Sequence, residues 1–268
     1  MTQFSEELIA RSGYERAGFA NRYDQYRPRP PRAPLELLCR FARAPEPAVV
    51  VDLGCGTGLS TRAWSGVAKR VIGIEPNPAM LAVAEDAPGV EYRAAYAQAT
   101  GLDDGVADIV TCSQSFHWME AEPTLAEATR ILRPGGVFAA YDYDMPPAVD
   151  PDVDAAFAAY LARRRGARAR RSIQQGADLW SKDKHLERMK ASGRFGFCRE
   201  VMLHSVEEGN AERVGGLARS LGLPIADPDD PALERELRID ELEAVAEEVL
   251  GARVVPFVFG YRVRLGVA

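Results

Sequence analysis

Apolar residues in the first half of the chain form short continuous runs, separated by longer segments in which apolar positions recur at helical spacing. A continuous run predicts a strand buried on both faces, because parallel strands covered by helices lose the usual alternation. Such strands are predicted at residues 49–53, 70–75, 109–111 and 137–142, and a further strand is predicted at residues 90–95. Helices are expected between them, at residues 59–64, 77–84 and 122–132. This alternation predicts a parallel, doubly wound α/β sheet.

The flanking parts of the chain follow a different pattern, in which helical periodicity dominates. Short helices are predicted before the first strand, at residues 4–26 and 35–44. Helices are also predicted after the fifth strand, at residues 155–171, 179–189, 211–221 and 240–250. Asp240 is the expected N-cap of the last helix, and Gly251 follows its end. Two late strands, at residues 195–205 and 257–265, would extend the sheet.

The most informative stretch is the end of the first strand. It reads Asp52-Leu-Gly-Cys-Gly-Thr-Gly58 and leads into a helix. Glycines at positions 54, 56 and 58 allow positive φ and let a ligand lie against the backbone. The unpaired N–H groups of the following helix would face that turn. A second apolar strand ends in an acid, Glu75, where a ribose diol would need a carboxylate acceptor.

This arrangement resembles motif I of the class I S-adenosylmethionine (SAM)-dependent methyltransferases. The third glycine comes one residue earlier than in a dinucleotide fingerprint. Leu132-Arg-Pro-Gly-Gly136 resembles the late motif of the same family, and Gln114-Ser-Phe-His-Trp118 resembles its trans-aconitate-methyltransferase-like (type 11) branch. The resemblance covers residues 49–145 motif by motif and the remainder only by layout. It implies a Rossmann-like sheet of seven strands, mostly parallel with an antiparallel closing strand, and a helical lid or insertion.

The resemblance also implies SAM as cofactor and S-adenosylhomocysteine as product. The residues it places at the cofactor are Asp52, Gly54, Gly56, Gly58, Glu75, Pro76, Ala97, Gln98, Ser113, Tyr23 and Arg27. One position departs from the family pattern, since Tyr96 stands where many members carry an aspartate that binds the adenine amino group. Recognition of adenine would then depend on the Ala97 backbone and Gln98. For Tyr23 and Arg27, simple packing and a solvated arginine are an equal alternative.

His117 is the candidate catalytic base, because the preceding strand delivers it to the sheet edge at which open α/β folds bind ligands. It could equally brace Trp118 or bind a loop carbonyl. The candidate acceptor-binding residues are Tyr14, Trp118, Tyr143 and Arg168. Arg168 belongs to an arginine-rich helix that could hold an anion, although a solvated helix face is the plainer interpretation.

Composition and net charge limit the classes of partner expected for this protein. The 268 residues carry a net charge of −6, and 47% are apolar, which is enough for a substantial core. An acidic protein lacks the basic face that nucleic acid requires, so a small-molecule acceptor is expected. The four cysteines show no metal-ligand spacing, which predicts reduced thiols and no metal. With neither a signal peptide nor a membrane span evident, the prediction is a cytoplasmic monomer or homodimer with no membrane partner.

A single methyltransferase domain is predicted over residues 1–268. Its parts are a helical lead-in (1–45), a SAM-binding core (46–145), a helical insertion over the acceptor pocket (146–195) and closing strands with intervening helices (196–268). The predicted function is methyl transfer to a small organic acid or natural-product metabolite, with O-methylation favoured over N- or C-methylation. Two rivals stay open. An NAD-dependent oxidoreductase would suit Glu75 but not the glycine spacing, and a non-catalytic SAM-binding protein could have the same sequence.

Overall fold

The computed structural model describes residues 19–175, 180–221 and 231–268. The chain divides into two compact units, each assembled from separate stretches of sequence. We call the first the helical unit; it comprises Met1–Pro28, Asp144–Asp178 and His204–Gly260. The second, the sheet unit, comprises Arg29–Tyr143, Leu179–Leu203 and Tyr261–Ala268. The predicted insertion at residues 146–195 is therefore shared between the two units.

Seven strands form one sheet in the order β3-β2-β1-β4-β5-β7-β6. Their bounds are β1 Val49–Leu53, β2 Arg70–Glu75, β3 Val90–Ala94, β4 Ala107–Ser113, β5 Leu132–Tyr143, β6 Phe197–Gly209 and β7 Val255–Val267. Strands β1 to β5 pair in parallel, whereas β7 runs antiparallel to β5. The predicted fold class, a mostly parallel sheet with an antiparallel closing strand, is confirmed.

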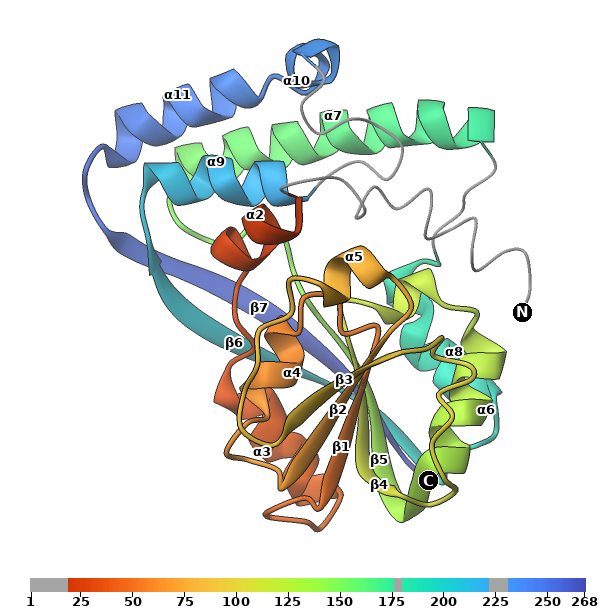
Figure 1. The fold of residues 1–268 in the computed structure, drawn as a ribbon. Helices are drawn as coiled ribbons and strands as arrows, with labels where there is room; N and C mark the ends of the chain where they lie inside the picture. Colours follow the sequence, from red (N-terminus) through yellow and green to blue (C-terminus); the bar gives the residue numbers. More distant parts are fainter. Residues whose placement is uncertain (1–18, 176–179, 222–230) are drawn as a thin grey trace. The chain divides into compact units, whose positions relative to one another are not determined.

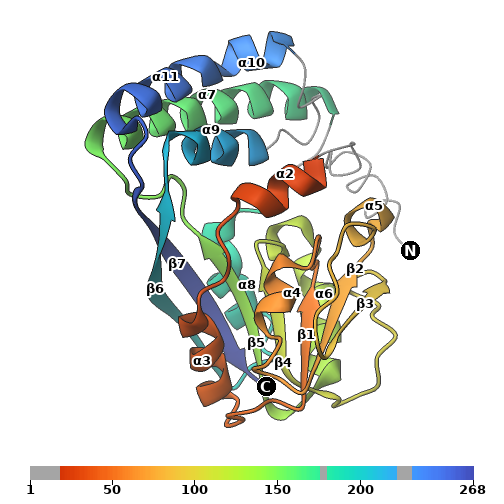
Figure 2. The same ribbon diagram turned by 60° about the vertical axis from the view of Figure 1, so that its left-hand side comes forward.

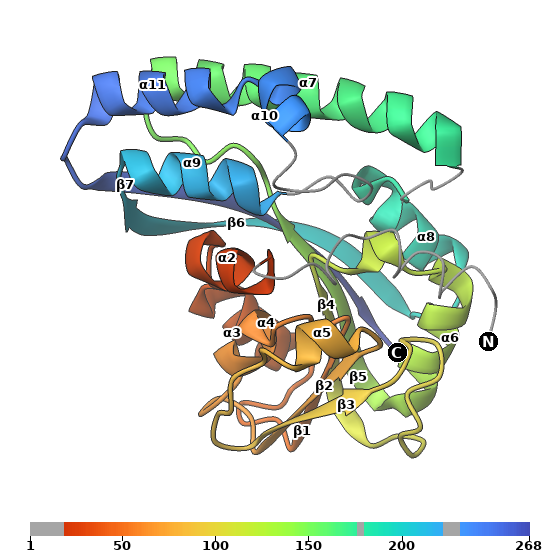
Figure 3. The same cartoon turned by 45° about the horizontal axis from the view of Figure 1, so that its top comes forward.

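Helices cover both faces of the sheet unit, which explains why its central strands are apolar throughout. In Figures 1 and 3, α3 (Arg32–Phe41) and α4 (Leu59–Ala63) lie on one face, and α6 (Ala121–Ile131) and α8 (His185–Ala191) lie on the other. Val51 on β1 is aligned with Ile72 on β2 and Val110 on β4, and all three are fully buried. Burial of such side chains stabilises the fold by about 1.5–3 kcal/mol each.

A short helix, α5 (Pro78–Leu81), follows β2. Asn77 caps it, because its side-chain oxygen accepts a hydrogen bond from the Ala79 N–H at 2.9 Å. The helix is shorter than expected and ends before the apolar run does. Its N-cap residue is connected to the end of β2, because the Asn77 N–H donates to the Glu75 carboxylate at 3.0 Å.

The helical unit contains α2 (Phe19–Tyr26), α7 (Pro151–Gln175), α9 (Ala211–Ser220), α10 (Pro231–Leu237) and α11 (Ile239–Leu250). Helices α7 and α11 run side by side in Figure 2, and α9 packs against α11. Tyr160 of α7 is buried and donates its hydroxyl hydrogen to the Ala218 carbonyl at 2.7 Å. This bond ties α7 to α9.

The arginine-rich face of α7 contacts other parts of the helical unit. Arg163 donates to the Leu237 carbonyl at 2.9 Å, and Arg164 donates to the Leu221 carbonyl at 2.7 Å. Arg170 pairs with Glu236 of α10. These arginines therefore bind carbonyls and a carboxylate of neighbouring segments. This structural role differs from both interpretations drawn from the sequence, anion binding and a solvated helix face.

Three local predictions differ from the structure. Strand β5 begins at Leu132, five positions before the expected start, because Arg133-Pro-Gly-Gly136 continues the strand. Helix α11 begins after Arg238, whose φ is 54°, so Asp240 lies in the first turn and is not the N-cap. The described part of the helix expected over 179–189, from residue 180 on, contains a 3₁₀ turn, η2 (Lys182–Lys184), followed by α8. Helix α10 was not predicted.

Candidate functional site

The glycine turn after β1 is held against the end of β2 by backbone hydrogen bonds. The N–H groups of Gly54 and Cys55 both donate to the Ile74 carbonyl, at 2.7 and 3.1 Å. Gly54 and Gly58 have φ of 67° and 79°, and this backbone conformation is strained for residues that carry a side chain. A Cβ on Gly58 would lie 2.2 Å from the Tyr92 hydroxyl oxygen. The turn therefore requires glycine for its conformation and for its close neighbours.

Asp52 lies beneath this turn and is fully buried. Its carboxylate accepts hydrogen bonds from the hydroxyls of Ser60 (2.6 Å), Thr61 (2.8 Å) and Thr111 (2.9 Å). Burial raises the pKa of Asp52, and the three hydrogen bonds oppose that rise. Both carboxylate oxygens therefore bind the protein, and Asp52 joins β1, β4 and the start of α4.

Glu75, at the end of β2, faces the glycine turn. One carboxylate oxygen accepts from the Gly56 N–H at 3.0 Å, and the other accepts from the Asn77 N–H at 3.0 Å. Burial raises the pKa of Glu75, while these two backbone bonds lower it. The side chain is half-buried, and Pro76 beside it is half-buried as well. A partly exposed carboxylate thus spans the opening of the turn.

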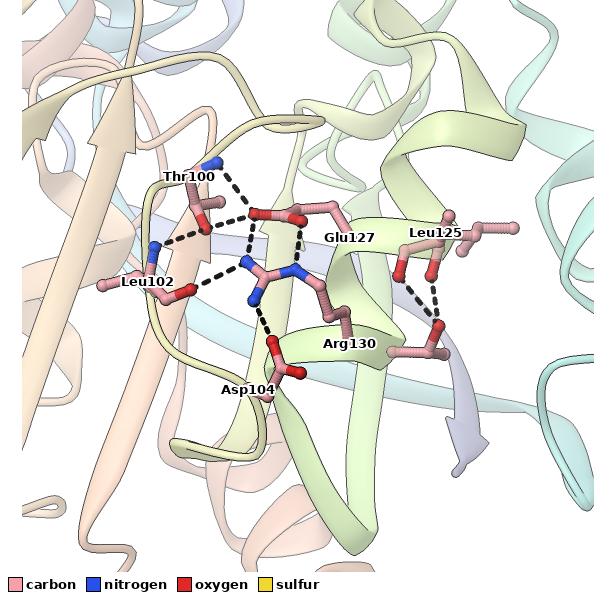
Figure 4. A network of polar contacts seen from close by, with 8 residues as sticks. Thr100, Leu102, Asp104, Leu125, Glu127 and Arg130 are labelled. Carbon is pink, nitrogen blue, oxygen red and sulfur yellow. Dashed lines mark hydrogen bonds and ion pairs between the residues drawn. The ribbon is translucent and has the colours of Figure 1, made fainter.

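The loop after β3 carries Ala97, which is buried, and Gln98, which is half-buried. Helix α6 anchors the next part of this loop through Glu127, which accepts from the Thr100 N–H (2.9 Å) and hydroxyl (2.6 Å), as Figure 4 shows. Arg130 pairs with Glu127 and donates to the Leu102 carbonyl at 2.8 Å. Burial of Glu127 disfavours its charge, yet hydrogen bonds from Arg130 and Thr100 lower its pKa overall.

This clamp of Glu127 and Arg130 was missed by the sequence analysis. The two residues are three apart on a helix, a spacing that favours ion pairs, but the spacing alone does not indicate which loop they bind. In the structure they fix the loop that follows Ala97 and Gln98. They therefore act as positioning residues for the predicted adenine-binding segment.

The segment after β4 brings His117 to the same edge of the sheet. The Ser115 hydroxyl donates to the Leu53 carbonyl at 2.7 Å, which joins this segment to the start of the glycine turn. His117 lies in a 3₁₀ turn, η1 (Phe116–Trp118), and its ring centroid is 5.6 Å from that of Trp118. The His117 carbonyl accepts from the Trp180 N–H at 3.0 Å. His117, Trp118 and Ser113 are half-buried.

A polar cluster lies beside this segment, at the carboxyl ends of β4 and β5. We call it the Asp142 cluster; its members are Gln114, Asp142, Lys182, Glu200 and Arg264. Asp142 pairs with the Lys182 ammonium and the Arg264 guanidinium, each at 2.9 Å. Arg264 also pairs with Glu200 at 2.8 Å, and Lys182 donates to the Gln114 side-chain oxygen. None of these pairings was predicted from the sequence.

His185, the first residue of α8, is fully buried beside this cluster. Its ring centroid is 4.9 Å from Phe116 and 6.5 Å from His117. Burial is the main reason that its pKa falls from 6.5 to about 4. The negative charge of Asp142 raises this pKa, whereas the positive charges of Arg264, Arg188 and Lys182 lower it. His185 is therefore neutral at pH 7.

The structure thus gathers most of the predicted site residues in the sheet unit: Asp52, Gly54, Gly56, Gly58, Glu75, Pro76, Ala97, Gln98, Ser113, His117, Trp118 and Tyr143. Asp52 lies under the turn and binds three protein hydroxyls, and its role at a cofactor stays a prediction. Tyr143 is 9% exposed and packs edge-on against Tyr261. Among the described residues, no group of three His, Cys, Asp or Glu could hold a metal ion.

The other predicted residues belong to the helical unit. The Arg27 guanidinium lies 4.6 Å from the Tyr23 ring centroid and donates to the Ser220 hydroxyl at 2.9 Å. Arg168 is on α7. Tyr14 lies outside the described residues. The contacts of Arg27 show how α2 is attached to α9, and their role at a cofactor stays a prediction.

Comparison with known proteins adds independent evidence. Residues 51–140 match a family model described as a methyltransferase domain. The Saccharomyces cerevisiae protein CRG1, described as an S-adenosylmethionine-dependent methyltransferase, is 31% identical over 136 residues, which are 48% of this chain and 46% of that protein. A malonyl-[acyl-carrier protein] O-methyltransferase of Pectobacterium atrosepticum is 29% identical over 138 residues, 51% of this chain and 53% of that enzyme.

One solved structure is similar to this protein over most of the chain. A protein of Anaeromyxobacter dehalogenans described as a type II methyltransferase superposes with a TM-score of 0.62 and 26% identity, covering 90% of this chain and 98% of that one. The chain spans between about a third and a half of the length of the curated relatives it matches. The glycine turn, the acid after β2, the sheet order and these similarities agree, and they support a methyltransferase domain of the class I SAM-dependent type at residues 51–140.

Proposed function

We propose that this protein transfers the methyl group of SAM to a small-molecule acceptor and releases S-adenosylhomocysteine. The observation that carries the proposal is the Glu75 carboxylate, which spans the glycine turn at 3.0 Å from the Gly56 nitrogen. A diol could replace or share such backbone contacts, because a carboxylate has about four lone-pair sites. The narrow turn, in which side chains would clash, fits a ligand that lies close to the backbone.

SAM supplies an electrophilic methyl group whose bond electrons stay on sulfur when the acceptor attacks, so the reaction needs no metal. Residues of this chain would act by orientation. Gly54, Gly56 and Gly58 would provide close backbone approach, Glu75 would accept from the ribose diol, and the loop anchored by Glu127 would place Ala97 and Gln98 at the adenine. Alignment of acceptor, methyl carbon and sulfur can account for about 7–11 kcal/mol of barrier reduction.

The acceptor determines whether His117 has a catalytic role. A phenol, alcohol or acidic carbon must lose a proton, and a placed base typically contributes about 10²–10⁴-fold. An ionised carboxylate needs no base. The O-methyltransferase among the relatives supports an oxygen acceptor. If a proton must be removed, His117→Ala should lower kcat by about 10²-fold or more and leave cofactor affinity within a few-fold.

Calorimetry with S-adenosylhomocysteine and with NADH separates the proposed function from its oxidoreductase rival. S-adenosylhomocysteine should bind and NADH should not. Glu75→Ala should weaken binding by about 1–3 kcal/mol through loss of charge-assisted contacts. Glu91→Ala is the matched control, since Glu91 on β3 is an exposed carboxylate paired with Arg70 and Arg93. Binding of NADH in place of S-adenosylhomocysteine would disprove the assignment.

Turnover separates an enzyme from a non-catalytic SAM-binding protein. Carboxylates, phenols and amines incubated with methyl-labelled SAM should yield at least one labelled product. Binding of S-adenosylhomocysteine without transfer to any member of a broad panel would favour the non-catalytic alternative. Glu75→Ala should lower whatever transfer the wild type shows, because the same carboxylate positions the cofactor.

We further infer that the protein acts in the cytoplasm on its small acceptor, as a monomer or homodimer without nucleic acid. All four cysteines are free thiols, which is the state expected in a reducing compartment. Among the helices that the structure describes, none is both long and apolar enough to cross a membrane. A sequence pI near 5.3 gives no support for a nucleic-acid partner.

A further inference from the structure

We propose that the Lys182 ammonium binds a carboxylate of the methyl acceptor, so that the acceptor is an organic acid. This inference rests on the proposed function and names the substrate class for the same site. The residues that carry it are Lys182, Gln114 and Asp142, which meet at the carboxyl ends of β4 and β5.

The position of Lys182 is fixed by two protein contacts and leaves one donor available. An ammonium group has three N–H donors. Lys182 uses one toward the Gln114 side-chain oxygen and one toward Asp142, and within the described part of the chain no third acceptor contacts it. Its side chain is 36% exposed. The remaining donor can therefore reach a ligand from solvent.

Gln114 links this ammonium to the cofactor cradle. It follows β4 directly, with the left-handed φ of 54° that is uncommon for residues other than glycine. Its amide nitrogen donates to the Tyr143 carbonyl at 3.2 Å, so its oxygen faces Lys182. The next residue, Ser115, binds the Leu53 carbonyl at the start of the glycine turn. Strained backbone is often retained at functional positions.

The segment that carries Lys182 is also attached beside His117. The Trp180 N–H donates to the His117 carbonyl at 3.0 Å. The Arg188 guanidinium lies 5.1 Å from the Trp180 ring centroid and donates to the Ser181 carbonyl at 2.8 Å. A backbone hydrogen bond thus attaches the segment that carries Lys182 to the residue His117, at the edge where open α/β sheets bind ligands.

The charges around this edge favour an anion. The cations that make the contacts described here are Lys182, Lys184, Arg188 and Arg264, and the carboxylates that face them are Asp142, Glu187 and Glu200. His185 stays neutral at pH 7. One positive charge is left over in a protein whose net charge is −6. An acceptor carboxylate would offset it.

A purely structural role is the competing explanation, in which Lys182 only stabilises buried Asp142. The two explanations differ in what a substitution changes. A structural lysine affects the denaturant midpoint, whereas an acceptor-binding lysine affects KM. Lys182→Gln removes the charge and keeps a donor, so the fold should tolerate it because Arg264 still pairs with Asp142.

The experiment compares Lys182→Gln with Lys184→Gln, whose lysine lies two residues on and is exposed and paired with Glu187. The probes are benzoate, succinate and tricarballylate, with benzamide and succinamide as uncharged analogues. Each is tested by calorimetry on protein saturated with S-adenosylhomocysteine and by transfer from methyl-labelled SAM. We expect a carboxylate to be bound and methylated, and its amide analogue to be neither.

Lys182→Gln should raise KM or Kd for that carboxylate about tenfold or more, the usual effect of a lost charge-assisted hydrogen bond, with kcat within a few-fold. Lys184→Gln should match the wild type, and Lys182→Arg should restore part of the affinity. The inference is overturned if S-adenosylhomocysteine binds normally and no carboxylate is bound, or if Lys182→Gln changes only the urea midpoint. Failure to bind S-adenosylhomocysteine would instead refute the proposed function on which the inference rests.

Discussion

Two buried aspartates of the sheet unit, Asp52 on β1 and Asp142 on β5, are held in opposite ways. Asp52 is fully buried and surrounded by three hydroxyl donors. Asp142 is 5% exposed and lies between the cations Lys182 and Arg264. The first carboxylate fixes a backbone turn, and the second organises charged side chains.

This difference matches the chemistry that each region would perform. A cofactor cradle must fit one invariant ligand, so a rigid backbone with neutral hydroxyl donors is sufficient. An acceptor site must select among substrates, and selection depends on side chains whose charge can differ between relatives. The two regions meet where Ser115 binds the Leu53 carbonyl.

The largest expected effect comes from a substitution in the Asp142 cluster. Arg264→Met removes a guanidinium that is 1% exposed and leaves Asp142 with Lys182 alone. Loss of one partner from a buried pair costs about 3–5 kcal/mol, which urea unfolding would measure. Arg194→Met, at a more exposed pair with Glu122, should cost less than about 1 kcal/mol. Equal losses in both variants would show that Arg264 has no special role.

The second prediction concerns the contribution of His185 to the pH dependence of folding stability. Its pKa is about 4 in the fold and 6.5 ordinarily, so the unfolded chain binds more protons between those values. Stability is then fully present above pH 6.5 and falls as the pH drops toward 4, by up to about 3 kcal/mol. His185→Leu should flatten this dependence of the urea midpoint.

The smallest expected effect comes from a substitution in the glycine turn after β1. Gly58→Ala and Gly66→Ala both place alanine at positive φ, which costs about 1–2 kcal/mol each. A Cβ on Gly58 would also meet Tyr92, whereas one on Gly66 has nothing within 4 Å. Gly58→Ala should therefore lose more stability, by about 1 kcal/mol, and weaken S-adenosylhomocysteine binding more than tenfold. If Gly66→Ala weakens binding equally, the clash is not the cause.

The cradle was predictable from sequence because its parts are local. Asp52, the three glycines and the first turn of α4 lie within a few residues, and the apolar runs identify β1 and β2 on either side. Strands β1, β2, β4 and β5 were predicted for the same reason, since each contains an apolar run between turn signals. Strand β3 was also predicted, although Val90-Glu-Tyr-Arg-Ala94 mixes apolar and charged residues. The start of β5 was misplaced by five residues, because glycine and proline usually end strands, and β4 extends two residues beyond its predicted bounds at each end.

The Asp142 cluster could not be predicted in the same way. Its members lie between Gln114 and Arg264 in sequence, and each alone resembles an ordinary surface residue. Arg264 shows the problem most clearly, because an arginine between Val263 and Leu265 suggests an alternating strand with one solvent face. Burial of that arginine depends on carboxylates supplied by β5 and β6.

The strand order has a consequence for biosynthesis. Strand β7 lies between β5 and β6, although it follows both in sequence. During translation, β5 and β6 therefore emerge from the ribosome before their shared neighbour exists, and the facing edges of both stay unpaired until residues 255–267 are made. Unpaired edges can recruit other chains. Ribosome-bound intermediates that end before residue 255 should consequently depend on chaperones, and release of that dependence should coincide with the appearance of β7.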